Sequence, residues 1–266
     1  MKILLCTIVR NRQDFASTWA SSLVLLASQS KDHEYSVSLY ENDSADESSD
    51  TYLAECKKSL RNSGQFDKIY FCSENIGTIA VEAEAVRVDS QTELRLENLS
   101  NARNKCIENA FAHRHASYYD KIIFIEPDIS YCPAQAHELI RKSAGTHIIS
   151  GRSALYPTSD IFYDTWATRF AKKIIPLTAE NAANWSKHHN DTIKLIKKSE
   201  GTLVKLASTF SGFCVYDSEI FANKVSFTFQ KDGIHDCDTS LICFDAIEKG
   251  YDKIFMYKDM LIFHYR

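Results

Sequence analysis

The sequence is poor in glycine and proline, with only 8 and 4 of them among 266 residues. No G-x-G-x-x-G or G-x-x-x-x-G-K-[ST] pattern occurs, so neither a dinucleotide-binding loop nor a P-loop is predicted. A G-x-S-x-G nucleophile elbow is also missing, and no two histidines have the spacing of a zinc-binding helix. Any phosphate that this protein binds must therefore be held mainly by side chains and a metal ion.

The sequence also lacks a large net charge and long apolar runs. The net charge of -4 is spread along the chain, which gives no basic footprint for nucleic acid. The apolar run at 2–9 is short and is soon followed by Arg10 and Arg12, unlike a signal peptide, and no run approaches the length of a membrane span. We expect a cytoplasmic protein without a transmembrane segment, with peripheral contact to a membrane as the alternative.

The 8 cysteines form no C-x-x-C pair, and most of them lie inside apolar runs. This distribution favours reduced core residues over a disulfide framework or a zinc site. Because 44% of the residues are hydrophobic, the chain can bury a large core without such cross-links. The composition therefore predicts one large domain, or one domain with a small annex.

The segment 118–133, YYDKIIFIEPDISYCP, carries the clearest chemical signal. The unbroken apolar run at 122–125 is typical of a strand covered on both faces. Pro127 cannot donate to a strand ladder, so pairing should stop there and leave Glu126 and Asp128 at a strand end, where open parallel sheets bind ligands. Two carboxylates one residue apart suit a divalent cation that also contacts phosphate. The alternative is a simple acidic turn.

Hydrophobic periodicity predicts strands that alternate with helices, the pattern of a doubly wound, mostly parallel α/β sheet. The predicted strands are 2–9, 35–40, 68–72, 122–125, 147–150, 211–217 and 253–265. Helices are predicted after the first two strands, from Leu99 onward, and from Asp238 to Lys249. Ser44 and Glu47 form a capping-box pattern before the second of these helices. Residues 178–202 are polar and rich in lysine, which predicts a helix. Its basic face is expected to be solvated, in preference to binding an acceptor or a membrane.

Arg103 lies on the apolar stripe of the helix predicted from Leu99, within its first two turns. Helix N-termini and strand C-termini meet at the same edge of a parallel α/β unit, so Arg103 should project toward Glu126 and Asp128. Its planar guanidinium could hold a diphosphate there. The alternative is a structural ion pair with one of the two acids.

Six blocks, taken in order, resemble the capsule-associated α-mannosyltransferase family of fungi and its microbial relatives. The blocks are YENDS, LSNARNKCIENA, YDKIIFIEPDISYCP, FYDTWATR, STFSGFCVYD and DTSLICFDAIEKGYDKIF. The resemblance spans nearly the whole chain and implies a single GT-A glycosyltransferase domain, with a nucleotide-sugar-binding half at 1–132 and an acceptor-binding half at 133–266. It also implies transfer of mannose or another hexose from a GDP- or UDP-sugar to a glycan hydroxyl, with Mn²⁺ or Mg²⁺ as cofactor and retention at the sugar carbon.

The resemblance assigns site residues position by position. The metal ligands are Asp128, Glu126 and His264. The donor-binding residues are Thr7, Arg10 and Asn11 after the first strand, Glu41, Asn42 and Asp43 after the second, and Arg103 and Gly212.

Asp238 matches an acidic residue twelve positions before a glycine, here Gly250, on the acceptor side. In a retaining enzyme Asp238 would orient the acceptor. In an inverting enzyme it would be the general base, with Asp236 as the alternative base. Asp238 could also be a plain N-cap of its helix.

The chain departs from the family at the metal strand, where Pro127 replaces the usual asparagine, so direct metal contact by Glu126 is a separate hypothesis. Fungal members carry a membrane anchor, whereas this sequence starts at its first strand, and we expect a microbial or viral relative without an anchor. A sugar-1-phosphate nucleotidyltransferase would share the sheet and the metal but needs a glycine-rich first loop, and VRNRQD contains no glycine. A catalytically inactive sugar-binding module of the same fold is the other alternative.

Overall fold

The computed structural model of the protein describes residues 1–45, 53–78, 90–154, 162, 164–176, 178, 180–181 and 184–265. Its strands are β1 (Lys2–Val9), β2 (Glu34–Asn42), β3 (Phe66–Glu74), β4 (Lys121–Ile125), β5 (Ile129–Tyr131), β6 (Ile148–Ala154), β7 (Leu203–Lys205), β8 (Phe213–Asp217), β9 (Gln230–Lys231), β10 (Ile234–His235) and β11 (Ile254–His264). Its helices are α1 (Ala16–Ser28), α2 (Leu53–Ser63), α3 (Ser90–Phe111), α4 (Pro133–Lys142), α6 (Trp185–Lys198), α7 (Ser218–Ala222) and α8 (Asp238–Glu248).

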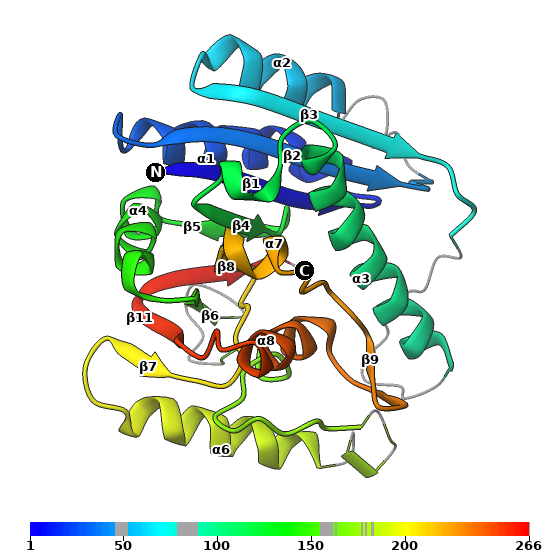
Figure 1. Ribbon diagram of the computed structural model, residues 1–266, viewed down its shortest axis with the longest axis vertical. Helices are drawn as coiled ribbons and strands as arrows, with labels where there is room; N and C mark the ends of the chain where they lie inside the picture. Colours follow the sequence, from blue (N-terminus) through cyan, green and yellow to red (C-terminus); the bar gives the residue numbers. More distant parts are fainter. Residues whose placement is uncertain are drawn as a thin grey trace.

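A nine-stranded sheet crosses the molecule in the order β3-β2-β1-β4-β8-β6-β11-β5, and β7 pairs with β11 (Figure 1). Strands β1, β2, β3 and β4 are mutually parallel, as the sequence predicts. Strand β8 runs antiparallel between β4 and β6, while β5 and β7 run antiparallel to β11. The sheet is therefore mostly parallel, and its antiparallel strands β5, β7 and β8 all follow β4 in the chain.

Strand β4 shows why this sheet requires unbroken apolar runs. Ile122 and Phe124 pack in the hydrophobic cluster that includes α3 and α8, whereas Ile123 and Ile125 pack in the cluster that includes α1, α2 and α4. All four side chains are at most 2% exposed. Because successive strand residues point to opposite faces, helices must cover both faces of the sheet.

Helix α3 begins at Ser90, so the predicted start near Leu99 is wrong, as is the prediction that Arg103 lies in the first two turns. At about 3.6 residues per turn, Arg103 lies almost four turns into the helix. The buried face of α3 includes Leu96, Ser100 and Arg103, at 3%, 2% and 4% exposure. Among residues 93–98 only Leu96 is buried, so hydrophobic periodicity did not detect the first part of the helix.

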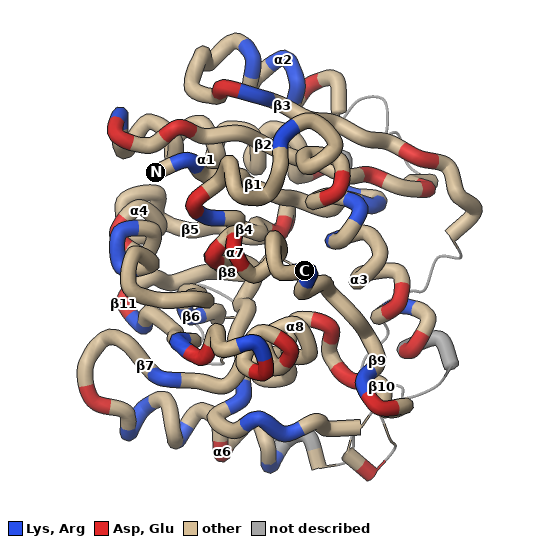
Figure 2. The backbone as a smooth tube through the Cα atoms, viewed as in Figure 1, with Lys and Arg blue, Asp and Glu red and all other residues tan. Residues whose placement is uncertain are grey.

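Other expectations can be compared directly with the structure. All 8 cysteines are free of disulfides, and most are buried, as expected for core residues. Helix α6 carries four exposed lysines, at 187, 194, 197 and 198, which confirms the solvated basic face. Figure 2 marks the basic positions along this helix in blue. Glu47 of the predicted capping box lies outside the described residues. Within the described ranges, every helix is too short or too polar to cross a membrane.

Candidate active site

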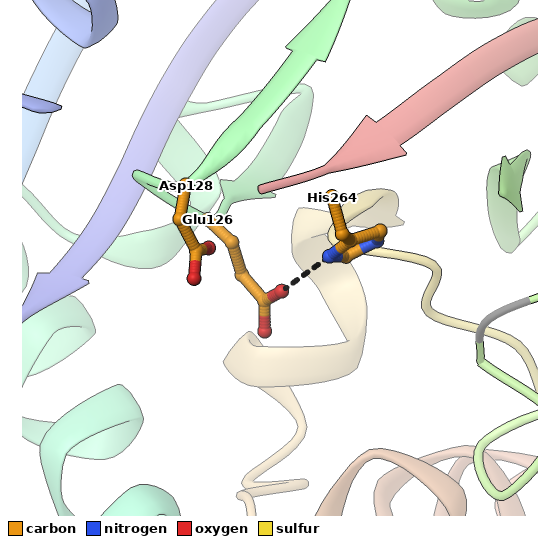
Figure 3. Close-up of side chains that lie close together, drawn as sticks. All are labelled: Glu126, Asp128 and His264. Atoms are coloured by element: carbon orange, nitrogen blue, oxygen red, sulfur yellow. Dashed lines mark ion pairs between the residues drawn. The ribbon is translucent and has the colours of Figure 1, made fainter. Parts of the chain in front are cut away.

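The predicted acidic strand end forms a cluster with a histidine from the far end of the chain. Glu126 follows β4, Asp128 directly precedes β5, and His264 is the last residue of β11. One ligand atom from each side chain lies within 4.8 Å of the other two (Figure 3). His264 Nδ1 is 3.8 Å from the Glu126 Oε2 atom. The structure therefore brings together all three residues that the sequence resemblance assigned to a metal.

Backbone pairing fixes this cluster. His264 stands opposite Ile129 in the antiparallel register of β11 and β5, and the Tyr265 N–H donates to the Asp128 carbonyl at 2.9 Å. Pairing of β4 stops at Pro127, as predicted, and the Glu126 N–H donates instead to the carbonyl of Gly212 at 2.8 Å. Strand pairing, and not a long loop, thus fixes the backbone that carries Glu126, Asp128 and His264.

The electrostatics of the cluster favour a cation. Burial, together with the neighbouring Asp128 carboxylate, raises the pKa of Glu126 to about 8. Burial also raises the pKa of Asp128, although the Arg12 guanidinium opposes that shift. A divalent ion would remove the repulsion between the two carboxylates, and a mixed carboxylate and imidazole set accommodates such an ion. The residues present therefore fit the metal that the resemblance implies.

Gly212 forms one wall of the cluster. Its φ is +76°, and a Cβ at this position would lie 2.7 Å from His264 Cε1 and 3.1 Å from Glu126 Oε2. Such close contacts, combined with a left-handed backbone, restrict this position to glycine. Gly212 thus lies beside the proposed metal ligands, which is compatible with its assignment to donor binding.

We expect Gly212→Ala to destabilise the protein by about 1–3 kcal/mol through backbone strain alone, with the contact to His264 adding to that cost. Gly145→Ala is the matched control, because no atom lies within 4 Å of its added Cβ and its φ is outside the left-handed region. Urea unfolding curves of the two variants measure the difference. Equal midpoints for both variants would show that the wall around Gly212 is not rigid.

Arg103 is held in the protein interior beside the cluster. It is 4% exposed, forms an ion pair with Asp238, and lies 3.5 Å from Glu126. Its guanidinium also stacks near the rings of Phe210 and Phe227, at 4.9 and 5.6 Å from their centroids. Burial disfavours its charge, but the Asp238 and Glu126 carboxylates raise the pKa of Arg103 above its ordinary value. The contact with Glu126 agrees with the predicted alternative of an ion pair with one of the two strand-end acids, whereas the ion pair with Asp238 was not predicted.

Asp238 begins α8, but it is not the N-cap of that helix. The N-cap is Cys237, which makes no side-chain capping hydrogen bond, so the capping hypothesis for Asp238 is wrong. The reason is that the Asp238 carboxylate turns to Arg103. Only 2% of the Asp238 side chain is exposed, so its carboxylate is enclosed by the protein.

Asp236, the alternative base, is fully buried, and both of its oxygens accept hydrogen bonds. Oδ1 accepts from Trp166 Nε1 at 3.0 Å and from Arg169 Nη2 at 3.1 Å, while Oδ2 accepts from the Ile175 N–H at 2.8 Å. Its carboxylate thus ties the segment 164–176 to the start of α8. This arrangement leaves Asp236 occupied by structural contacts.

Two loops predicted to bind the donor are linked to each other. After β1, Asn11 accepts a hydrogen bond from the Ala45 N–H at 2.7 Å, and its own N–H donates to Ser44 Oγ at 3.1 Å. Glu41 in turn accepts from the Ser44 N–H at 3.0 Å. The loops that follow β1 and β2 are therefore held together at the carboxyl edge of the sheet.

The loop after β3 joins them through Asp43. The Asp43 carboxylate accepts from three consecutive backbone N–H groups, residues 76–78, at 2.8–3.0 Å. Burial opposes the charge, but hydrogen bonds from Thr78, Asn42 and the backbone lower the pKa of Asp43 below its ordinary value. Arg10 Nη2 also donates to the Thr78 carbonyl at 2.7 Å. The loops after β1, β2 and β3 thus meet at the residues that the resemblance assigns to donor binding.

Three placements differ from the prediction. Thr7 lies inside β1 instead of following it, and it is 1% exposed. Its hydroxyl donates to the Ile125 carbonyl and accepts from Trp19 Nε1, so it connects strands and a helix in the core. Glu41 and Asn42 are the last two residues of β2 instead of loop residues.

Sequence reasoning missed two further residues at this site. Arg12 Nη2 lies 3.5 Å from Asp128 Oδ2, and its position next to Arg10 and Asn11 in VRNRQD was the available signal. Asp164 accepts a hydrogen bond from the N–H of Ser211, one residue before the glycine that contacts the cluster. The available signal for Asp164 was its place in the FYDTWATR block of the resemblance.

Comparison with known proteins shows which protein family the chain matches. The chain matches the protein-family model described as cryptococcal mannosyltransferase 1 over residues 2–245. A search of curated proteins finds no match.

Solved structures with a similar fold include several glycosyltransferases. TarS of S. aureus (residues 1–349) has a TM-score of 0.53 at 12% identity, over 99% of this chain and 60% of that chain. The mannosyltransferase PcManGT from Pyrobaculum calidifontis, solved with GDP-Man and Mn²⁺, has a TM-score of 0.55 at 8% identity, over 99% and 56%. GalNAc-T7, solved with UDP, GalNAc and Mn²⁺, has a TM-score of 0.54 at 13% identity, over 100% and 44%. This chain thus spans about three fifths or less of these structures, and at such low identities the likeness shows the fold alone, which is GT-A.

Proposed function

The chain belongs to the cryptococcal mannosyltransferase 1 family and is a GT-A glycosyltransferase, and from this premise we propose that it transfers a hexose, with mannose favoured, from a nucleotide sugar to a glycan hydroxyl with the help of a divalent metal ion. The observation that carries this proposal is the cluster of Glu126, Asp128 and His264, which lies at a strand end within one sheet. In this scheme residues 1–132 hold the donor, and residues 133–266 hold the acceptor.

Glu126, Asp128 and His264 would hold Mn²⁺ or Mg²⁺. Bound there, the ion supplies positive charge that stabilises the departing nucleoside diphosphate. Arg12, beside Asp128, adds a second positive charge on the solvent side of the cluster. The missing side chain of Gly212 leaves room for the His264 ring and the Glu126 carboxylate, so both could reach the ion.

The three linked loops would bind the nucleoside. Arg10 and Asn11 come from the first loop, and Glu41, Asn42 and Asp43 come from the end of β2. Because Glu41 and Asp43 use their carboxylates to hold backbone N–H groups, they would shape the pocket, while neighbouring atoms contact the base and ribose. Either GDP or UDP is compatible with this arrangement, since PcManGT was solved with GDP-Man and TarS with UDP-GlcNAc.

A screen of nucleotide sugars by thermal shift, with and without Mn²⁺, tests the proposal. A ligand that binds only the folded state stabilises it by about 2.7 kcal/mol at 100 times its Kd. We expect one nucleotide sugar to raise the melting temperature, and only when Mn²⁺ is present. A shift with nucleoside triphosphate and sugar phosphate would favour a nucleotidyltransferase instead, and no shift with any nucleotide would favour an inactive sugar-binding module.

Asp238→Asn separates the roles open to this acid. We propose that Asp238 orients the site, since its carboxylate holds Arg103, which in turn lies 3.5 Å from Glu126. The variant keeps a hydrogen-bonding oxygen but loses the ion pair, so we expect a raised acceptor KM, a measurable residual rate and a lower unfolding midpoint. Steady-state kinetics and urea unfolding give both readouts. A stable variant without any turnover would instead identify Asp238 as the general base.

Retention of configuration is the stereochemical outcome that we propose. In a retaining transfer the leaving phosphate can take the acceptor proton, so no protein base is required. This agrees with the engagement of Asp238 by Arg103 and of Asp236 by Arg169. NMR of the product anomer, compared with the α-linked donor, tests this outcome, and an inverted product would contradict it.

A further inference from the structure

The turn that precedes β8 has an unusual backbone. Ser211 and Gly212 both have positive φ angles, +60° and +76°. A left-handed conformation costs an ordinary residue about 1–2 kcal/mol, so Ser211 adopts it only if surrounding contacts hold it there. Ser211 is fully buried. This turn places the carbonyl of Gly212 where it accepts the Glu126 N–H at 2.8 Å.

Asp164 supplies a contact that holds this turn. Its Oδ2 accepts the Ser211 N–H at 2.6 Å. Its backbone is anchored on both sides, because its N–H donates to Ser153 Oγ at 3.2 Å and its carbonyl accepts from Thr168 Oγ1 at 2.8 Å. The acid is thus fixed before it meets the turn.

The segment that carries Asp164 is itself held near the start of α8. Arg169, at 3% exposure, forms an ion pair of 3.1 Å with the buried Asp236, two residues before α8. The backbone of Arg169 also forms an antiparallel bridge with Ser208, three residues before Ser211. A continuous series of buried polar contacts therefore leads from the start of α8 through Asp164 to the wall of the metal cluster.

We propose that Asp164 is a positioning residue for the metal site: by holding the Ser211–Gly212 turn, it sets the distance between Glu126 and His264. This inference rests on the proposed function, in which those side chains bind a metal. Asp164 itself need not touch the metal, because its effect passes through the Gly212 backbone, which bonds to Glu126 and leaves space for His264.

Mn²⁺ titration of the intact chain, followed by EPR of the free ion, tests this role without reference to activity. Loss of a group that orients metal ligands typically weakens metal affinity by about 10–100-fold, and we expect that loss for Asp164→Ala. Asp164→Asn keeps an oxygen that can accept the Ser211 N–H, so its Kd should stay close to the wild-type value. Asp164→Glu keeps the charge but displaces the oxygens by a methylene group, so its Kd should rise, which covers the case in which Asp164→Ala does not fold.

Asp217→Ala is the matched control. Asp217 is an acid at the other end of β8, where it pairs with Lys121 far from the turn. Its loss should lower the unfolding midpoint and leave the Mn²⁺ Kd unchanged. Wild-type Mn²⁺ affinity in both Asp164→Ala and Asp164→Glu would overturn the positioning role alone. No Mn²⁺ binding by the wild-type chain would overturn the proposed function, and this inference with it.

Discussion

Asp128→Asn is expected to abolish nearly all sugar transfer and to leave the fold intact. The position of Asp128 depends on its backbone carbonyl, which accepts from Tyr265, and its side chain is 22% exposed. Asparagine has the same shape, so the packing should not change. It lacks the charge that a divalent cation requires, and the metal contributes several kcal/mol to stabilising the leaving group. At about 1.4 kcal/mol per factor of ten, the expected loss in kcat is on the order of 1000-fold.

Asp120→Asn provides the comparison, because Asp120 lies at the opposite end of β4 and accepts a hydrogen bond from the Lys2 N–H at 2.7 Å. We expect it to keep wild-type transfer, and we expect both variants to unfold near the wild-type midpoint. EDTA should reproduce the effect of Asp128→Asn, whereas His264→Ala should be milder. Normal turnover in EDTA, or by the Asp128→Asn protein, would contradict a metal role for this residue.

Arg103→Ala is expected to produce the largest loss of stability. Asp238, at 2% exposure, would remain buried without its partner, and Glu126 would lose a neighbouring positive charge. Removing one partner of a buried ion pair typically costs about 3–5 kcal/mol. The guanidinium would also leave a gap beside Phe210 and Phe227. Chemical unfolding followed by tryptophan fluorescence measures the change.

The surface pair of Arg141 with Glu138 gives a matched control. The Arg141 side chain is 67% exposed, so Arg141→Ala should leave the unfolding midpoint nearly unchanged. Arg103→Lys then tests the diphosphate hypothesis, because a lysine cannot replace a bidentate guanidinium. Wild-type stability combined with weakened donor binding in Arg103→Lys would assign Arg103 to the donor and not to the ion pair.

The sequence predicted the parts of the site that depend on local patterns. The apolar run before Glu126 predicted a strand covered on both faces, and Pro127 predicted where its pairing stops. His264 was different, because its approach to Asp128 depends on the register between β5 and β11, more than 120 residues apart in the chain. Only the family resemblance indicated that residue.

The errors have physical causes. Hydrophobic periodicity placed the start of α3 too late because Leu96 is the one buried residue among residues 93–98, which gives no apolar stripe. Asp238 looked like a helix cap because aspartate is favoured there, but a buried arginine competes successfully for its carboxylate. Asp164 lies in the FYDTWATR block of the resemblance, but nothing in the sequence indicated its role, since its partner Ser211 is 47 residues away. For Asp238 and Asp164 the decisive contacts are between polar groups far apart in the chain.

The central antiparallel strand β8 also constrains how the chain is made. Because β8 pairs with both β4 and β6, the ribosome has synthesised at least 213 residues before either of those strands gains this neighbour. Until then β4 presents an unpaired edge, the kind of surface that promotes aggregation in incomplete chains. A fragment ending near residue 132 would keep that edge permanently. The two halves of the enzyme are therefore expected to mature together, and neither should be obtainable as a well-behaved separate product.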